Sequence, residues 1–100
     1  MMYTKADFGR ELKELALQKQ NIIEIGIWVH STYLKYCEHL ESGLRKIMLG
    51  LNTMELGPEF ARSYEILNKI ADDLIAGKEI DLNATEYRDK NDILGWTKLE

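Results

Sequence analysis

Residues 21–40, NIIEIGIWVHSTYLKYCEHL, decide the fold of this chain of 100 residues. The side-chain oxygen of Asn21 can accept hydrogen bonds from the first free amides of a helix, and Glu24 stands three positions later, as in a capping box. The pattern predicts a helix over residues 22–40. At about 100° per residue, apolar side chains cover well over half of its circumference. These side chains are Ile23, Ile25, Ile27, Val29, Tyr33, Leu34, Tyr36, Cys37 and Leu40.

The predicted helix over residues 22–40 should lie at the centre of a bundle, because a helix that is apolar on most sides must be covered from several directions. Gly26 falls within the apolar arc and costs about 1 kcal/mol relative to Ala in a helix interior. We therefore expect Gly26 to mark the close approach of a neighbouring helix. The remaining polar arc contains Glu24, Trp28, Ser31, Thr32, Lys35, Glu38 and His39.

Three further amphipathic segments are predicted to be helices, because apolar residues recur in them at helical spacing. They cover residues 5–18 behind the Thr4–Asp7 capping box, residues 43–56 behind Ser42, and residues 64–76 between Ser63 and Gly77. Gly57-Pro58 ends the third helix, since proline has no amide hydrogen and disfavours helical geometry in the residue before it.

The predicted fold class is all-α, a small four-helix orthogonal or irregular bundle with a docked, mostly irregular C-terminal segment. We expect residues 1–77 to form the helical core and residues 78–100 to pack on it within one domain, since a chain of this length supports a single core. The C-terminal segment is too apolar for a solvated tail. Its apolar residues include Ile80, Leu82, Ile93, Leu94, Trp96 and Leu99.

Composition excludes several classes of function. The chain has 13 Lys and Arg against 17 Asp and Glu, a formal charge of -4, which argues against binding to a phosphate backbone. The single cysteine rules out an internal disulfide framework. No apolar stretch approaches the length of about 20 residues that a membrane span needs. We therefore expect a cytoplasmic protein that binds neither nucleic acid nor membrane.

Residues that could carry chemistry do not form a recognisable catalytic or metal site. His30 and Cys37 share one side of the predicted helix, but seven residues separate them by about 10.5 Å along the axis. A zinc ion lies only about 2 Å from each of its ligands. Adjacent Asp72 and Asp73 point about 100° apart on a helix and cannot act as a pair. The sequence predicts no enzyme, no metal and no cofactor.

Apolar residues away from the predicted core point to protein binding instead. Trp28 stands in the polar arc in one row with Thr32, Lys35 and His39, while Leu49 and Leu56 lie on the back of the helix over residues 43–56. Tryptophan is enriched among residues that dominate binding energy at interfaces. The alternative, which we prefer for Trp28, is that the C-terminal segment or the core covers its ring.

The opening Tyr3-Thr4-Lys5-Ala6-Asp7-Phe8, followed by Glu11-Leu12-Lys13-Glu14-Leu15, resembles the first helix of the small acidic helical immunity proteins that inhibit nuclease colicins. The resemblance covers about one helix. It does not extend to the acidic, tyrosine-bearing inhibitory helix of that family, so no functional residue is carried over.

The sequence thus predicts a small acidic, non-catalytic protein–protein interaction or regulatory module, which binds a protein partner or associates with itself as a homodimer. Its candidate surface comprises Trp28, Thr32, Lys35, His39, Leu49 and Leu56. The alternative is a small-ligand-binding or catalytic protein, with a pocket between the helix over residues 22–40 and the C-terminal segment. His30, Tyr33 and Tyr36 would line that pocket.

Overall fold

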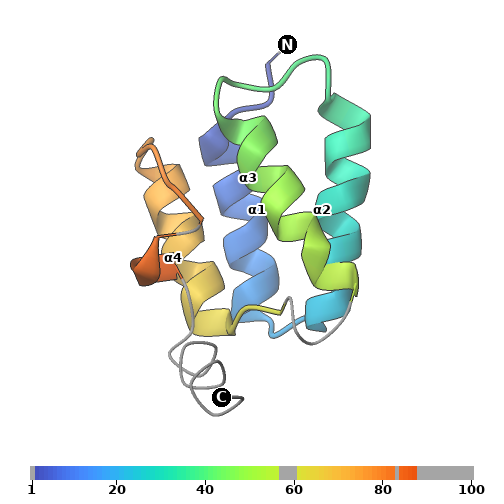
Figure 1. Ribbon diagram of the computed structural model, residues 1–100, viewed down its shortest axis with the longest axis vertical. Coiled ribbons are helices and arrows are strands. Elements are labelled where there is room, and N and C mark those ends of the chain that lie inside the picture. Colours follow the sequence, from blue (N-terminus) through green and yellow to red (C-terminus); the bar gives the residue numbers. More distant parts are fainter. Residues whose placement is uncertain (1, 57–60, 83, 88–100) are drawn as a thin grey trace, which may run out of the picture.

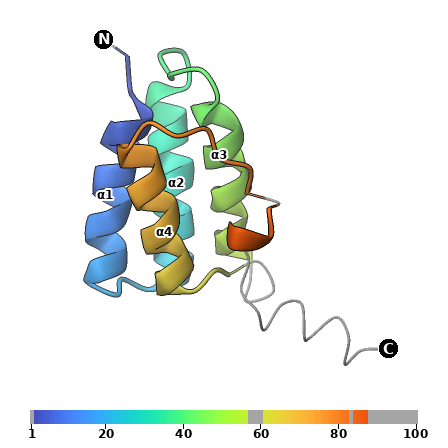
Figure 2. The same cartoon turned by 90° about the vertical axis from the view of Figure 1, so that its left-hand side faces the viewer.

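In the part of the chain that the structure describes, four α-helices lie alongside one another and alternate in direction (Figures 1 and 2). The computed structural model describes residues 2–56, 61–82 and 84–87. Its elements are α1 (Lys5–Leu17), α2 (Ile22–Tyr36), α3 (Leu44–Leu51), the 3-10 helix η1 (Asn52–Leu56), α4 (Tyr64–Ile75) and the 3-10 turn η3 (Thr85–Tyr87). The predicted all-α helical bundle is confirmed. It is an irregular bundle, since α3 leans across the direction of the other axes (Figure 1).

Local capping explains where three of the helices begin. Thr4 and Asp7 form a reciprocal capping box at α1, Asn21 accepts hydrogen bonds from two amides of α2, and Ser63 accepts one from α4. Helix α3 differs from the expectation, because Gly43 and not Ser42 occupies its N-cap position. Gly43 has a φ of 87°, a left-handed conformation that favours glycine, and it caps α3 without a side-chain hydrogen bond.

Two glycines allow the helices to pack closely in pairs. Helix α1 packs against α4, and α2 packs against η1 and α3. A Cβ atom on Gly9 would lie 2.8 Å from the carbonyl oxygen of Ala71 in α4. A Cβ atom on Gly26 would lie 2.5 Å from the backbone nitrogen of Glu55 in η1. The close approach expected at Gly26 is therefore present, although the neighbour is a 3-10 helix.

The side of α2 that is buried differs from the expected one. Ile25, Val29 and Thr32 face the core, and the ring of Trp28 also turns inward, whereas Leu34 is 63% exposed. Helix α2 is therefore packed on one side and is not the central element. Periodicity could not fix its rotation, because its apolar arc covers more than half of the circumference. Its contacts with α1 and η1 decide which part of that arc is buried.

Helix α2 also ends at Tyr36, four residues before the expected Leu40. Beyond Cys37 the chain leaves the helix and pairs with the N-terminal residues. Tyr3 donates its amide to the His39 carbonyl at 2.7 Å and accepts from the Glu41 amide at 2.9 Å, in a parallel bridge between Tyr3 and Leu40. These long-range hydrogen bonds replace those that a longer helix would have made.

The core fills the space between the two helix pairs. Its fully buried large side chains are Phe8, Leu12, Ile25, Val29, Leu44, Met48, Leu51, Met54, Leu67, Ile70 and Leu74. All four helices and η1 contribute to this set, so a single core holds the described residues together.

The described part of the C-terminal segment docks on the bundle as predicted. After Gly77 the chain crosses from the end of α4 toward α3 (Figure 2). The Lys5 ammonium lies 3.0 Å from a Glu79 carboxylate oxygen, and Leu82 packs over Gly50 of α3. Tyr87 is only 3% exposed. The expectations for Ile93, Leu94, Trp96 and Leu99 fall outside the described residues.

Replacing Tyr87 by phenylalanine should destabilise the protein by about 1.5 kcal/mol at neutral pH, the contribution of a hydrogen bond to a charged group. The Tyr87 hydroxyl donates to a carboxylate oxygen of Asp73 at 2.6 Å. This bond, helped by Lys69 and Lys78, lowers the pKa of Asp73. The stabilisation is complete above the ordinary pKa of an aspartate and is lost as the pH falls through the lower pKa in the folded chain. Urea denaturation of both proteins at several pH values measures the difference.

Tyr64→Phe is the matched control for Tyr87→Phe. The Tyr64 hydroxyl donates to the backbone carbonyl oxygen of Gln20 at 2.8 Å, and this acceptor does not titrate. Its loss should cost about 1 kcal/mol with little change across the same pH range. An equal dependence on pH in both variants would contradict the assignment to Asp73.

Candidate interaction surface

Three aliphatic side chains form an exposed row on α2. Ile23, Ile27 and Leu34 are 44%, 48% and 63% exposed. At about 100° per residue they lie within about 40° of one another, on the side of α2 opposite Ile25. The row spans about 16 Å along the helix axis. We call these three residues the outer face of α2.

Charged residues accompany the outer face along one flank. Glu24 and Lys35 are both exposed and lie at nearly the same angle around the helix axis. Neither forms an ion pair with another described residue: Gln20 hydrogen-bonds to Glu24, and the Lys35 ammonium lies 5.2 Å from the centre of the Tyr36 ring. The other flank adjoins η1, where the Nδ1 atom of His30 lies 3.3 Å from Glu55 Oε1.

The four residues predicted to form a row around Trp28 do not share one exposed surface. The Trp28 ring stacks on the Phe8 ring of α1, with ring centres 5.2 Å apart and planes inclined by 5°. Thr32 is only 8% exposed, while Lys35 and His39 are exposed. Core packing therefore accounts for Trp28, and α1 provides it. Residues Leu49 and Leu56 are 40% and 65% exposed, as their position on the back of α3 and η1 implied.

The three residues of the alternative pocket point to different neighbours. His30 lies beside Glu55. The guanidinium carbon of Arg45 lies 6.0 Å from the centre of the Tyr33 ring. The Tyr36 ring stacks on the Tyr3 ring, with ring centres 4.3 Å apart. The hollow beside residues 79–82 is lined by none of the three, and the pocket near the start of α1 is lined by Tyr36 alone of them. The pairing of Tyr3 with Leu40 draws Tyr36 toward the N-terminus instead.

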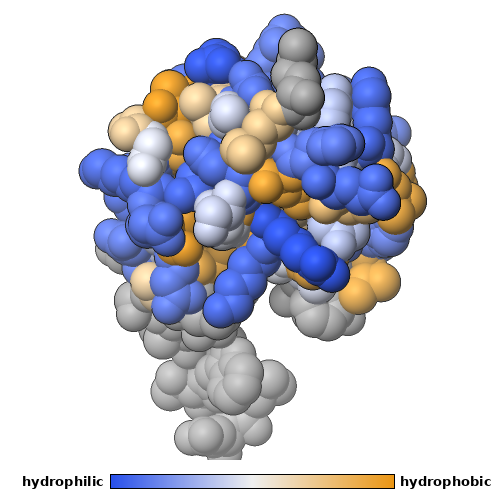
Figure 3. All heavy atoms as spheres, turned by 90° about the horizontal axis from the view of Figure 1, so that it is seen from above, coloured by the Kyte–Doolittle hydropathy of each residue, from blue (hydrophilic) through white to orange (hydrophobic). Residues whose placement is uncertain are grey.

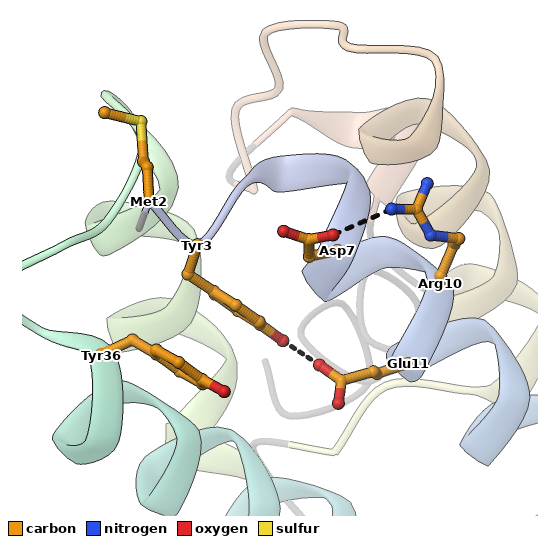
Figure 4. A pocket seen from close by; sticks show the side chains of 6 residues that line it. All are labelled: Met2, Tyr3, Asp7, Arg10, Glu11 and Tyr36. Atoms are coloured by element: carbon orange, nitrogen blue, oxygen red, sulfur yellow. Dashed lines mark hydrogen bonds and ion pairs between the residues drawn. The ribbon is translucent and has the colours of Figure 1, made fainter.

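Tyr36 contributes to a shallow pocket of about 340 Å³ near the start of α1 (Figure 4). Its lining residues are Met2, Tyr3, Asp7, Arg10, Glu11 and Tyr36. The Tyr3 hydroxyl donates to the Glu11 carboxylate, and Arg10 lies 2.8 Å from Asp7. Burial and the Glu11 carboxylate raise the pKa of Tyr3, so the hydroxyl stays protonated. Four of the six lining side chains are thus paired within the pocket, Tyr3 with Glu11 and Arg10 with Asp7.

A second hollow, of about 570 Å³, lies where the C-terminal segment crosses α3. Residues of α3, including Lys46 and Ile47, form one wall, and residues 79–82 form the other. The end of the bundle shown in Figure 3 is covered mainly by hydrophilic side chains, with smaller hydrophobic groups between them. Neither region concentrates one kind of side chain as the outer face of α2 does.

Among the described residues, no group of three or more His, Cys, Asp and Glu side chains could hold a metal ion. No described helix combines the length and the apolar character that crossing a membrane requires.

Comparison with known proteins gave no match: no protein family, no curated protein and no solved structure is detectably similar to this sequence. The resemblance of residues 3–15 to the immunity proteins therefore assigns neither a family nor a function to this chain.

Sequence reasoning missed the outer face of α2 as a surface, although it singled out the apolar residues that form it. Ile23, Ile27 and Leu34 belonged to the arc expected in the core. The signal that could have identified the face is the size of that arc, since a helix in a small bundle cannot bury apolar residues on all sides. One part of the arc had to remain exposed.

Proposed function

We propose that this protein is a small non-catalytic protein-interaction module that binds its partner through the outer face of α2. One observation carries the proposal: Ile23, Ile27 and Leu34 stand exposed in a single row, opposite the buried side of the helix. Single exposed apolar residues are common and need no explanation. A row at helical spacing is the arrangement by which helices recognise apolar surfaces of other proteins.

The size of the row supports a helix as the binding partner. It is one side chain wide and about 16 Å long, which matches about three turns of a second helix. Burying one such aliphatic side chain completely contributes about 1.5–3 kcal/mol, so three of them can support specific association. The partner we propose is an amphipathic helix with aliphatic residues along one side and charges that complement Glu24 and Lys35.

The exposed thiol of Cys37 supports a cytoplasmic location for this module, because reducing compartments keep free thiols from forming disulfides. The formal charge of -4 supports a protein partner rather than a nucleic acid.

A photo-crosslinking amino acid placed at Leu34 tests the proposed surface in cells. We expect a discrete crosslinked product larger than the monomer, which mass spectrometry then identifies. The same group at Leu17 is the matched control, because Leu17 is 64% exposed on α1 and lies outside the row. Ile27→Glu in the same chain should abolish the product from position 34, because it places a charge in the middle of the apolar contact.

Two outcomes would contradict the proposal. One is a crosslinked product that forms equally well from Leu34 and Leu17, since this would indicate nonspecific contact. The other is a product of monomer mass from position 34, since this would mean that another part of the same chain covers the outer face.

A further inference from the structure

The outer face of α2 is complementary to itself. We propose that its partner is the outer face of a second copy, packed antiparallel about a two-fold axis that lies between the two copies, perpendicular to α2 and level with its midpoint. This inference rests on the proposed function and names the occupant of the same surface.

The apolar row fits a two-fold arrangement. Ile23 and Leu34 lie eleven positions apart at its ends, and Ile27 lies near its middle. A two-fold axis perpendicular to the helix reverses the direction of the second copy, so Ile23 lies beside Leu34 of the partner subunit. The two Ile27 side chains then approach each other near the axis. Each aliphatic side chain of the row thereby gains an aliphatic neighbour.

The charges on the flank fit the same arrangement. Glu24 and Lys35 are also eleven positions apart, and both lie on one side of the row. A two-fold rotation keeps this side and reverses the helix direction, so Glu24 of one copy faces Lys35 of the partner subunit. The symmetry generates this pair twice. Neither residue has an ion pair among the described residues of its own chain, so both are available.

A parallel arrangement of the two copies lacks this complementarity. Its two-fold axis runs along the helices, so the flank with Glu24 and Lys35 lies on opposite sides of the interface in the two copies. Neither residue then faces its opposite charge, and the two attractive pairs of the antiparallel arrangement are lost. The charge pattern therefore favours the antiparallel pair.

The expected dimer is weak. A single pair of short helices buries less than the roughly 1,200 Å² at which stable interfaces begin. We therefore expect the monomer to predominate at nanomolar concentration and the dimer to appear in the micromolar range or above. Sedimentation of the full-length chain over a concentration series detects this equilibrium.

Charge reversal tests the arrangement. Glu24→Lys and Lys35→Glu should each weaken dimerisation by about tenfold or more, because each change turns two attractive contacts into repulsive ones. The double variant Glu24→Lys/Lys35→Glu restores both pairs with the signs exchanged, so its dimerisation constant should return to near that of the wild type. Glu14→Lys is the control, since it changes the net charge as Glu24→Lys does but lies on α1.

Disulfide trapping provides a second test that does not depend on the strength of the ion pairs. In a Cys37→Ser background, Glu24→Cys and Lys35→Cys proteins are mixed and oxidised. The antiparallel arrangement predicts a disulfide between the two different variants and little within either variant alone. The absence of a disulfide between the two variants, or disulfides within each variant that form as readily as those between them, would overturn the inference.

The result for the wild type separates this inference from the proposed function. A chain that stays monomeric at the highest concentration overturns the second copy as partner. If crosslinking at Leu34 then yields a different protein, the interaction module stands and only its partner was wrongly identified. If the chain dimerises but both charge reversals leave the constant unchanged, the antiparallel geometry is overturned.

Discussion

Trp28→Ala is expected to lower the free energy of unfolding by about 3 kcal/mol, near the lower end of the range for removing a large aromatic side chain from a core. The Trp28 ring lies flat against Phe8, with ring centres 5.2 Å apart. Its loss removes both the stacking contact and the apolar cover that it gives to α1. Urea denaturation at low protein concentration measures this effect on the monomer.

Leu34→Ala is the matched control on the same helix. Leu34 is 63% exposed, so its truncation should change the stability of the monomer by less than about 0.5 kcal/mol. The reverse ranking, with Leu34→Ala costly and Trp28→Ala harmless, would mean that α2 buries the opposite side. That result would remove the basis for the outer face as a binding surface.

Gly26→Ala is expected to destabilise the protein by about 2 kcal/mol, although alanine favours a helix by about 1 kcal/mol over glycine. The new Cβ atom would lie 2.5 Å from the Glu55 nitrogen and 3.0 Å from the carbonyl carbon of Met54. Both are backbone atoms, so the overlap can be relieved only if α2 and η1 move apart. Thermal and urea denaturation of the variant measure the cost.

Gly50→Ala tests whether the neighbouring backbone is the cause. A Cβ atom at Gly50 would lie 2.6 Å from a terminal methyl group of Leu82, and this flexible side chain can turn away. We expect Gly50→Ala to be neutral within about 0.5 kcal/mol, because the gain in helix propensity offsets a small rearrangement. Equal destabilisation by both substitutions would contradict the close backbone contact at Gly26.

Local signals allowed the helices to be predicted well from the sequence. Thr4, Asn21 and Ser63 cap α1, α2 and α4 at the positions where they were expected to do so. Gly77 follows α4 with a φ of 78°, as a residue after a helix end commonly does. These interactions involve residues only a few positions apart, so a short stretch of sequence contains all the partners. The all-α fold class follows from them.

The candidate site could be predicted only in part. The sequence identified Ile23, Ile27 and Leu34 as apolar, but it assigned them to the core, and it placed Trp28 in the polar arc, where a cover from the C-terminal segment or the core had to be added. Any rotation of a helix with so wide an apolar arc buries some apolar residues and exposes others. Several rotations of α2 about its axis would therefore bury nearly the same number of apolar residues. The sequence of α2 alone does not determine which of these rotations occurs.

The sequence by itself determined where the helices begin and that they form a bundle, because capping and amphipathic spacing act over one or two turns. Only the tertiary structure decided which side of α2 is buried. Trp28 stacks on Phe8, twenty positions away in the sequence. Gly26 packs against the η1 backbone at Glu55, nearly thirty positions away. These contacts turn the outer face toward the surface, since one helix rotation must satisfy both of them at once.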